Sequence, residues 1–265
     1  MIKIDPKYYK NFYEIFEEID CYVGVLGVLD GIANGHIYAD KVDNPTSAVI
    51  FTDDGYYLAG DFTNKEVNRS LYELSQSDVF PEYAGLLFNS NRLEGIKSIF
   101  GKRLYEFVDR NSYKLNENNF DEAIENKFEF VKVIPENLMD FKNYDNFKTL
   151  HDRCMFFWGE YVDNPKMNFC IALVIDNVVA SMCIVSQESL SKNCCELDVE
   201  TVESFRQKGY ALAVVNETIK EVFKRGYNKI FWNCDKINVG SRKIAEKLKF
   251  QKNNETYLVW FDKKL

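Results

Sequence analysis

The sequence predicts a mixed α/β protein built on a mixed sheet, and three observations support this class. Strand-like apolar segments alternate with amphipathic helical segments, a hairpin pattern occupies residues 168–187, and 46% of the 265 residues are hydrophobic, which is enough for a substantial core. A chain of this length suits one large domain or two small ones. We expect two domains, residues 1–125 and residues 126–265.

Residues 1–125 are expected to form the smaller domain, of mixed α and β structure. Strands or buried segments, separated by Asp-Gly and Asn-Pro turns, are predicted at residues 21–31, 35–42 and 47–61. A helix at 70–77, a strand at 83–90 and a helical segment at 91–101 follow. The glycines in this half are irregularly spaced and form no nucleotide-binding fingerprint, so we assign packing or turn roles to Gly24, Gly27, Gly31 and Gly35.

The predicted boundary is a polar, asparagine-rich stretch at residues 114–127, which we interpret as a linker or a solvated helix. After it, the residue patterns predict a regular succession of strands and helices. The predicted elements are a strand at 128–134, a helix from about 136 to 157, strands at 168–175 and 178–187 turning at Asp176-Asn177, a strand at 196–202, a helix at 211–225 ended by Gly226, a strand at 229–234, a helix from Asn238, and a strand at 256–261. No internal sequence repeat is evident.

A glycine turn at residues 206–211, with the sequence RQKGYA, joins a predicted strand to a predicted helix. Gly209 permits a backbone conformation that gathers consecutive N–H groups, and the small Ala211 lets a diphosphate approach the start of the helix. Arg206 and Lys208 add positive charge. An ordinary strand-to-helix turn with solvated basic residues is the alternative interpretation of this loop taken alone.

The turn, the element order around it and the segment NVGSRKIAEKLKF at 238–250 together resemble the GNAT superfamily of N-acetyltransferases. The resemblance implies a GNAT acyl-CoA N-acyltransferase fold for residues 126–265, acetyl-CoA as cofactor, and direct transfer of acetyl to a primary amine. The N-terminal half, including NPTSAVIFTDDGYYLAGD, is similar to the extension of bacterial two-part GNAT proteins. One interpretation of that half, by analogy of fold, is a diverged GNAT-like half on the acceptor side.

The same resemblance assigns residues to the cofactor. It places the pantetheine arm of coenzyme A along the strand before the turn and the diphosphate at the turn itself, with Asn238 facing the arm and Ser241 one helical turn on. The implied cofactor-binding residues are Val199, Glu200, Thr201, Arg206, Gln207, Lys208, Gly209, Tyr210, Ala211, Asn238 and Ser241. Helix capping by Asn238 and simple packing by Ser241 are the alternatives.

For catalysis, a carboxylate on the strand before the turn can remove the ammonium proton of the acceptor. Glu196 is the leading candidate, followed by Asp198 and Glu200, and the period of two places all three on one strand face. Solvated acids on an exposed face are the alternative for at least two of them. Many relatives carry a tyrosine that acts as the acid protonating the departing thiolate. At that position this sequence has Ala245, and so departs from the family.

Two other departures are milder: Lys249 replaces a common glycine, and Asn233 stands where some relatives carry a catalytic glutamate. Because Ala245 replaces the usual acid, we assign protonation of the departing thiolate to water or to Tyr257. A third option is that no acid is needed, since a coenzyme A thiol can leave unassisted. Two alternative functions stay open, a non-catalytic acyl-CoA sensor or partner-binding module of the same fold, and an acetyltransferase for protein N-termini or lysines.

The charge distribution limits the kinds of partner that we expect. Residues 1–125 contain 12 Lys and Arg against 22 Asp and Glu, whereas residues 126–265 contain 21 against 19. This acidic N-terminal half argues against nucleic acid and favours a small cationic amine as acceptor, although ordinary solubility charge explains it equally well. The sequence leaves a homodimer open.

Membrane, export and metal functions have little support in the sequence. No apolar run approaches the roughly 18 to 20 residues that span a bilayer, and the N-terminus lacks the pattern of a signal peptide. Seven scattered cysteines without a CxxC pair fit reduced thiols in a cytoplasmic protein better than a disulfide framework or a zinc site. His36 and His151 lack metal-ligand spacing, so we expect neither a metal nor a membrane partner.

Overall fold

The structure is a computed structural model that describes residues 1–52, 54–121, 128–159 and 167–265. The chain forms two compact units: unit 1 comprises Met1–Ser112, Asn233–Val239 and Lys252–Leu265, and unit 2 comprises Tyr113–Trp232 and Gly240–Gln251. This division differs from the expected pair of consecutive domains, 1–125 and 126–265. The difference arises because the C-terminal strand returns to unit 1, where its residues 256–262 pair with a strand of the N-terminal half.

Unit 1 contains a mixed sheet with three α-helices and several short 3-10 turns. The sheet order is β1-β2-β3-β4-β5-β12-β6, in which β1 to β4 are antiparallel neighbours, β4 and β5 are parallel, and β5 and β12 are antiparallel. The elements are β1 (Ile2–Lys3), η1 (Pro6–Phe12), η2 (Ile15–Ile19), α1 (Val23–Asp30), β2 (His36–Ala39), β3 (Ser47–Phe51), β4 (Tyr56–Gly60), α2 (Lys65–Gln76), β5 (Tyr83–Asn89), η3 (Ser90–Arg92), α3 (Leu93–Phe100), η4 (Gly101–Arg103), β6 (Leu104–Asn116) and β12 (Gln251–Asp262).

The core of unit 1 is rich in aromatic residues, which bury large apolar areas and stabilise the sheet against its helices. Phe80 lies at the centre, with ring centroids 5.2 Å from Phe51 and 5.8 Å from Phe261. Phe261 comes from the C-terminal strand and is fully buried, as is Phe88 of β5. The C-terminal strand is therefore a structural part of unit 1.

Two expectations for the N-terminal half were incomplete. Residues 21–31, expected as a strand or a buried segment, form the buried helix α1, which ends at Gly31 in the left-handed conformation (φ 77°). The long strand β6 was missed, because its residues alternate poorly between apolar and polar and Glu106 has a positive φ of 47°. The N-terminal part of the polar stretch at 114–127 belongs to β6 and to η5 (Glu117–Asn119), and residues 122–127 lie outside the described residues.

The strands of unit 2 belong to the same twelve-stranded sheet and follow the order β6-β11-β10-β9-β8-β7, and the last four residues of β6 lie in this unit. Its strands β7 to β10 are antiparallel neighbours, and β10 and β11 are parallel. The elements are β7 (Val131–Val133), η6 (Leu138–Phe141), α4 (Phe147–Gly159), β8 (Cys170–Ile175), β9 (Val178–Ser189), β10 (Cys194–Thr201), η7 (Glu203–Phe205), α5 (Tyr210–Lys224), β11 (Lys229–Asp235) and α6 (Val239–Lys247).

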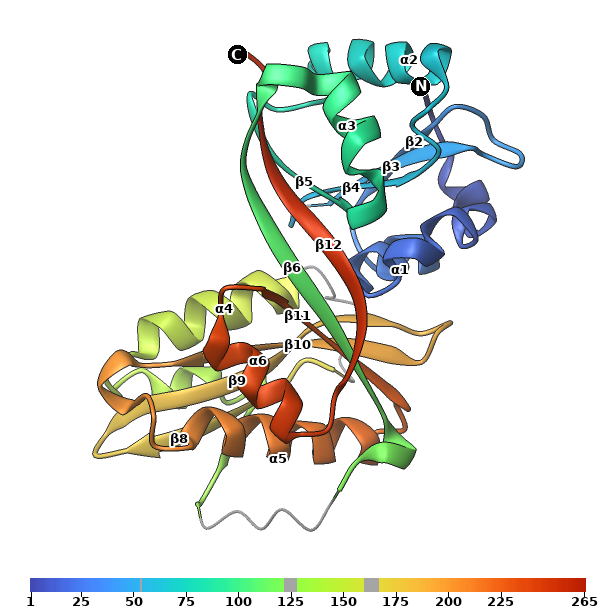
Figure 1. The fold of residues 1–265 in the computed structure, drawn as a ribbon. Coiled ribbons are helices and arrows are strands. Elements are labelled where there is room, and N and C mark those ends of the chain that lie inside the picture. The colour runs from blue at the N-terminus through green and yellow to red at the C-terminus, as the bar shows by residue number, and fades with distance from the viewer. Residues whose placement is uncertain (53, 122–127, 160–166) are drawn as a thin grey trace. The chain divides into compact units, whose positions relative to one another are not determined.

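Helices α4 and α5 cover opposite faces of the unit 2 sheet (Figure 1). Met182 and Ile184 of β9 belong to the apolar cluster that contains Leu150 and Cys154 of α4. The intervening residue, Cys183, lies beside Thr218 of α5. Because side chains alternate along a strand, Met182 and Ile184 face α4 and Cys183 faces α5. Asp198 and Glu200 of β10, which pair with Ile184 and Met182, therefore also lie on the α4 face.

Most elements predicted for the C-terminal half are confirmed. The hairpin turns at Asp176 and Asn177, whose φ values of 49° and 62° fit a type I′ turn. The helix expected from about 136 to 157 is divided into η6 and α4, with Asn146 in a left-handed conformation (φ 65°) between them. Residues 158–166, whose sequence WGEYVDNPK predicts a connection between helix and strand, lie largely outside the described residues.

None of the helices in the described part of the chain combines the length and the apolar character needed to cross a membrane.

The end of α6 shows why relatives commonly carry a glycine at the position of Lys249. Lys249 follows the helix with φ 64°, the left-handed conformation in which glycine commonly ends helices, and Phe250 N donates to Ala245 O over 2.9 Å. A residue with a Cβ is strained in this conformation. The glycine of relatives at this position is therefore explained by backbone geometry.

We predict that Lys249→Gly stabilises the protein by about 0.5–1 kcal/mol, because it removes left-handed strain at an exposed position. Urea denaturation measures the free energy of unfolding. Lys243→Gly, at an exposed position inside α6, is the matched control and should destabilise by about 1 kcal/mol. Equal losses in both variants would contradict the helix-end explanation.

Candidate functional site

The loop between β10 and α5 has the backbone geometry of an anion-binding turn. Gln207 and Gly209 both have positive φ, 62° and 85°, on either side of Lys208. Arg206 Nε donates to the carbonyl oxygen of Thr201 over 3.1 Å and so ties the loop to the end of the strand. Alternation of left- and right-handed residues turns successive N–H groups toward one side, as in the backbone nests that hold phosphates.

The N–H groups of this loop are available to a ligand. Within the described ranges, no acceptor is found for the backbone N–H groups of residues 207–212, and the first described bond of the helix runs from Ala213 N to Gly209 O over 3.0 Å. The helix has no side-chain cap, because its N-cap is Gly209. A Cβ on Gly209 would meet no atom within 4 Å, so the space in front of the helix is open.

These observations fit a diphosphate group. Free N–H groups at a helix N-terminus favour negative charge. Lys208 is exposed, with its Nζ 4.9 Å from the centroid of the Phe205 ring, and adds positive charge beside the loop. Tyr210 packs edge-on against Phe128, with ring centroids 5.3 Å apart, and Ala211 is half-buried, so the first helical turn is held in place.

Strand β10 leaves one backbone edge without a strand partner just before this loop. Its parallel pairing with β11 is limited to three residue pairs and ends at Glu196 and Phe231, whereas its antiparallel pairing with β9 continues to Thr201 and Ser181. Beyond Glu196 the two parallel strands are no longer paired. Val199, Glu200 and Thr201 therefore pair with β9 alone, and their other edge is suited to an extended ligand that adds to the sheet.

The acidic residues of β10 are not equivalent. Asp198 and Glu200 share the α4 face of the strand, as expected, and Arg153 of α4 binds both, with N–O distances of 2.5 and 2.6 Å. Burial lowers the pKa of Arg153, but the two carboxylates outweigh it and the net pKa lies above the ordinary value. Both acids are thus partnered by a cation. Glu196 is the last residue paired with β11, and the pairing of β10 with β9 shifts register between Glu196 and Leu197.

The proposed acid, Tyr257, lies on β12 within unit 1. A hydrogen bond to Asp109 and partial burial raise the pKa of the Tyr257 phenol, and its ring packs against Phe88 at 6.2 Å. The phenol therefore stays protonated, but its hydroxyl is already hydrogen-bonded to Asp109. Ala245, in place of the family tyrosine, is fully buried on α6.

The two residues assigned to the start of α6 have different surroundings. Ser241 Oγ accepts a hydrogen bond of 2.9 Å from Trp232 Nε1, so its role includes fixing a buried tryptophan within unit 2. Asn238 is exposed, and its backbone N–H donates to Asp235 O over 2.9 Å. Asn238 falls within unit 1 and Ser241 within unit 2. Asn233, at the position of a glutamate in some relatives, donates from Nδ2 to Cys21 O over 2.8 Å and is a structural link in unit 1.

Sequence reasoning missed two polar groups of unit 2. Arg153 gave no signal, because a lone arginine in an amphipathic helix usually faces solvent. Glu188 of β9 is almost fully buried and accepts a hydrogen bond from the Tyr227 hydroxyl, and burial together with this bond raises the pKa of Tyr227. All seven cysteines are buried free thiols. Among the described residues, no cluster of three His, Cys, Asp or Glu side chains is suited to a metal ion.

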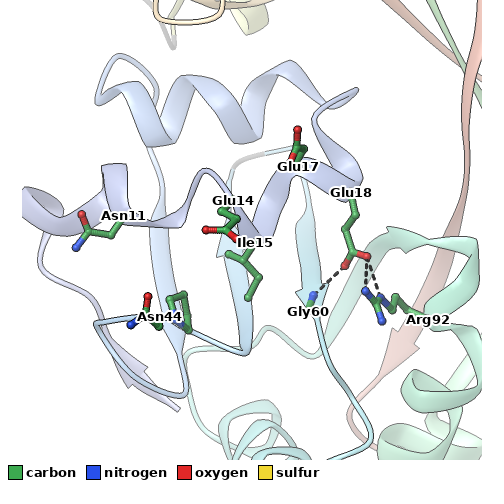
Figure 2. Close-up of a pocket in the computed structure, with 9 residues that line it drawn as sticks. Asn11, Glu14, Ile15, Glu17, Glu18, Asn44, Gly60 and Arg92 are labelled. Atoms are coloured by element: carbon green, nitrogen blue, oxygen red, sulfur yellow. Dashed lines mark hydrogen bonds and ion pairs between the residues drawn. The ribbon is translucent and has the colours of Figure 1, made fainter.

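Unit 1 has an acidic pocket of its own, of about 480 Å³ (Figure 2). Its wall includes Glu14, Glu17 and Glu18 from the N-terminal 3-10 turns. Glu18 differs from the other two, because it binds both the Gly60 N–H (2.8 Å) and Arg92 (2.7 Å). The remaining lining residues are Asn11, Ile15, Asn44, Pro45, Gly60 and Arg92.

Comparison with known proteins agrees with this geometry. The chain is 25% identical over 263 residues to "Uncharacterized N-acetyltransferase YdfB" of Bacillus subtilis (strain 168), covering 98% of this chain and 97% of the relative. Among solved structures, a GCN5-related N-acetyltransferase-like protein from Streptococcus suis matches with a TM-score of 0.65 and 17% identity, covering 97% of this chain and 98% of its own.

A tandem GNAT protein from the clavulanic acid biosynthesis pathway has the same fold, with a TM-score of 0.57, 9% identity and coverage of 95% of each chain. The predicted fold class, mixed α/β of the GNAT type, is thereby confirmed, and it extends over both halves of the chain. The family model for GNAT acetyltransferase matches residues 13–259, and the chain belongs to the GNAT acetyltransferase family.

Proposed function

We propose that this protein is an acetyl-CoA-dependent N-acetyltransferase that transfers acetyl directly to a primary amine of a small cationic molecule. The observation that carries the proposal is the open β10–α5 loop, in which the N–H groups of residues 207–212 have no acceptor among the described residues. In a family of acetyltransferases, the ligand that needs such a loop together with an unpaired strand edge is coenzyme A.

The loop and the strand bind different parts of the cofactor. The N–H groups of the loop, Arg206 and Lys208 hold the diphosphate. The edge of Val199 to Thr201 that lacks a strand partner pairs with the pantetheine arm as a further strand would, beside the Thr201 carbonyl oxygen that accepts Arg206 Nε. When bound, acetyl-CoA supplies a thioester whose carbonyl carbon is attacked by the amine. Asn238 and Ser241 are assigned to the arm, and Ser241 also holds Trp232.

Glu196 is the proposed general base. It lies where β10 and β11 separate, so its carboxylate is placed at the end of the unpaired edge. In the transfer, Glu196 removes one proton from the ammonium, the amine nitrogen forms a bond with the acyl carbon, and the bond from that carbon to sulfur breaks. The nitrogen then loses its second proton, which passes through water to the departing thiolate. Backbone N–H groups of the β10 edge stabilise the charge on the acyl oxygen. The thiolate leaves without an acid from Tyr257, whose hydroxyl is engaged by Asp109.

The acidic composition of residues 1–125 supports a cationic acceptor, since a negative field raises the local concentration of cations. Transfer to a protein N-terminus or lysine is a less specific use of the same chemistry. We place the protein in the cytoplasm, because the thiols are free and buried.

The cofactor site is tested by thermal shift with acetyl-CoA. At about 100 times the dissociation constant, binding should stabilise the wild type by about 2.7 kcal/mol, which raises the melting temperature by roughly 5–10 °C. Gly209→Val should lose this shift, because it strains the loop and fills the open space.

Gly226→Val is the matched control for that experiment. Gly226 ends the same helix with φ 91°, and a Cβ there also meets no atom within 4 Å. The two substitutions thus carry similar backbone strain, but only one faces the cofactor. Loss of the acetyl-CoA shift in both variants, or in neither, would contradict the assignment of the loop.

The catalytic assignment predicts different effects for two acids of one strand. Glu196→Gln should lower kcat by about 10²-fold or more, because it removes the base. Asp198→Asn should lower kcat by less than about tenfold, since Asp198 is occupied by Arg153. Steady-state kinetics with an accepted amine measure both, and a larger loss from Asp198→Asn would exchange their roles.

A second function, a non-catalytic acyl-CoA sensor or partner-binding module, is favoured by one observation, the buried Ala245 in place of the family tyrosine. The two functions predict different results in a thiol-release assay with a panel of primary amines. We expect amine-dependent release of coenzyme A above the rate without protein. Acetyl-CoA binding without release for any amine would support the sensor instead.

A further inference from the structure

The two units repeat one order of elements, which the sequence does not reveal. In unit 1, antiparallel strands β2, β3 and β4 are followed by α2, by β5 parallel to β4, then by α3 and β6. In unit 2, antiparallel strands β8, β9 and β10 are followed by α5, by β11 parallel to β10, then by α6 and β12. Strand β4 and the N-terminus of α2 are thus the counterparts of β10 and the N-terminus of α5.

The parallel pairs in the two units also have the same number of paired residues, which in each case are the first three of the earlier strand. Three residue pairs join β4 to β5 and end at Leu58 and Phe88, just as three pairs join β10 to β11. The strands then differ in length. Strand β10 continues for five residues, to Thr201, but β4 continues for only two, to Gly60. The unpaired edge that could receive a cofactor arm is therefore much shorter in unit 1.

That short edge is occupied by the protein itself (Figure 2). Glu18 Oε1 accepts the N–H of Gly60, the last residue of β4, over 2.8 Å. Its Oε2 binds Arg92, which follows β5, at 2.7 Å, and its carbonyl oxygen accepts Asn89 Nδ2 at the end of β5 over 3.0 Å. Glu18 thus joins the ends of the two parallel strands at the place where, in unit 2, the strands separate.

The helix start in unit 1 is closed as well. Asn64 caps α2, with its Oδ1 accepting the N–H groups of Glu66 (2.9 Å) and Val67 (3.4 Å). Asp61 Oδ1 accepts the N–H of Thr63 over 2.9 Å, and Glu66 adds a negative charge in the first turn. The loop lacks the basic residues found before α5. A diphosphate would meet carboxylates and N–H groups that already have acceptors.

We infer that unit 1 is a second acetyltransferase-like half in which the Glu18 side chain occupies the place of the cofactor arm, so that each chain binds a single acetyl-CoA. This inference rests on the proposed cofactor site of unit 2. It assigns Glu18 to holding β4 and β5 together, and it separates the two halves by role: unit 2 binds the cofactor, and unit 1 does not.

Isothermal titration of the full-length protein with acetyl-CoA tests the inference. We expect one equivalent bound by the wild type and none by Gly209→Val, whose folding is verified by its melting curve. Two equivalents in the wild type, of which Gly209→Val retains one, would place a second site in unit 1 and overturn the inference. No binding to the wild type would instead overturn the proposed function on which it rests.

Two variants of neighbouring glutamates test the assigned role of Glu18. Glu18→Ala should lower the melting temperature by about 3 °C or more, because Gly60 N–H and Arg92 lose their shared acceptor, and it should leave one equivalent bound at an unchanged dissociation constant. Glu17→Ala, at an exposed position of the same pocket, should change neither quantity. Equal melting temperatures for the two variants would show that Glu18 does not hold the strands.

Discussion

The structure of the candidate site depends on one feature of sheet pairing, the point at which two parallel strands stop exchanging hydrogen bonds. In unit 2 this point is the pair Glu196 and Phe231, and five residues of β10 continue beyond it with β9 as their only strand partner. Because unpaired backbone groups in a sheet seek partners, the continuation creates a ready edge for an extended ligand. The loop with Gly209 follows this edge and is tied to its last residue by the bond from Arg206 Nε to the Thr201 carbonyl oxygen.

Charge on the same strand is balanced by a residue from elsewhere in the unit. Three acids within five residues of β10 would repel one another, and Arg153 of α4 relieves this by binding Asp198 and Glu200. The pairing gives the acids different surroundings although they have similar chemistry. Glu196, the base proposed for the transfer, is the last residue of β10 that pairs with β11.

The contrast between the units shows how small local changes close an equivalent place in the same fold. Both units have a helix after the strand that carries the edge, and both parallel pairs are limited to three residue pairs. In unit 1 a shorter strand, a side-chain cap from Asn64 and the Glu18 carboxylate supply internal partners for groups that the other unit leaves open. The fold is thus shared, whereas the availability of backbone N–H groups differs.

The sequence by itself determined the features that depend on local pattern: the Asp176-Asn177 hairpin, the α5 helix between Gly209 and Gly226, and the turn at RQKGYA. These follow from residue conformation and periodicity, which act over a few positions. Only the tertiary structure decided what depends on long-range pairing. The return of β12 to unit 1, the role of Arg153, the engagement of Tyr257 by Asp109 and the bond from Glu18 to Gly60 all join residues far apart in the sequence. The separation is 42 positions for Glu18 and Gly60 and 45 for Arg153 and Asp198, and no local pattern records such pairs.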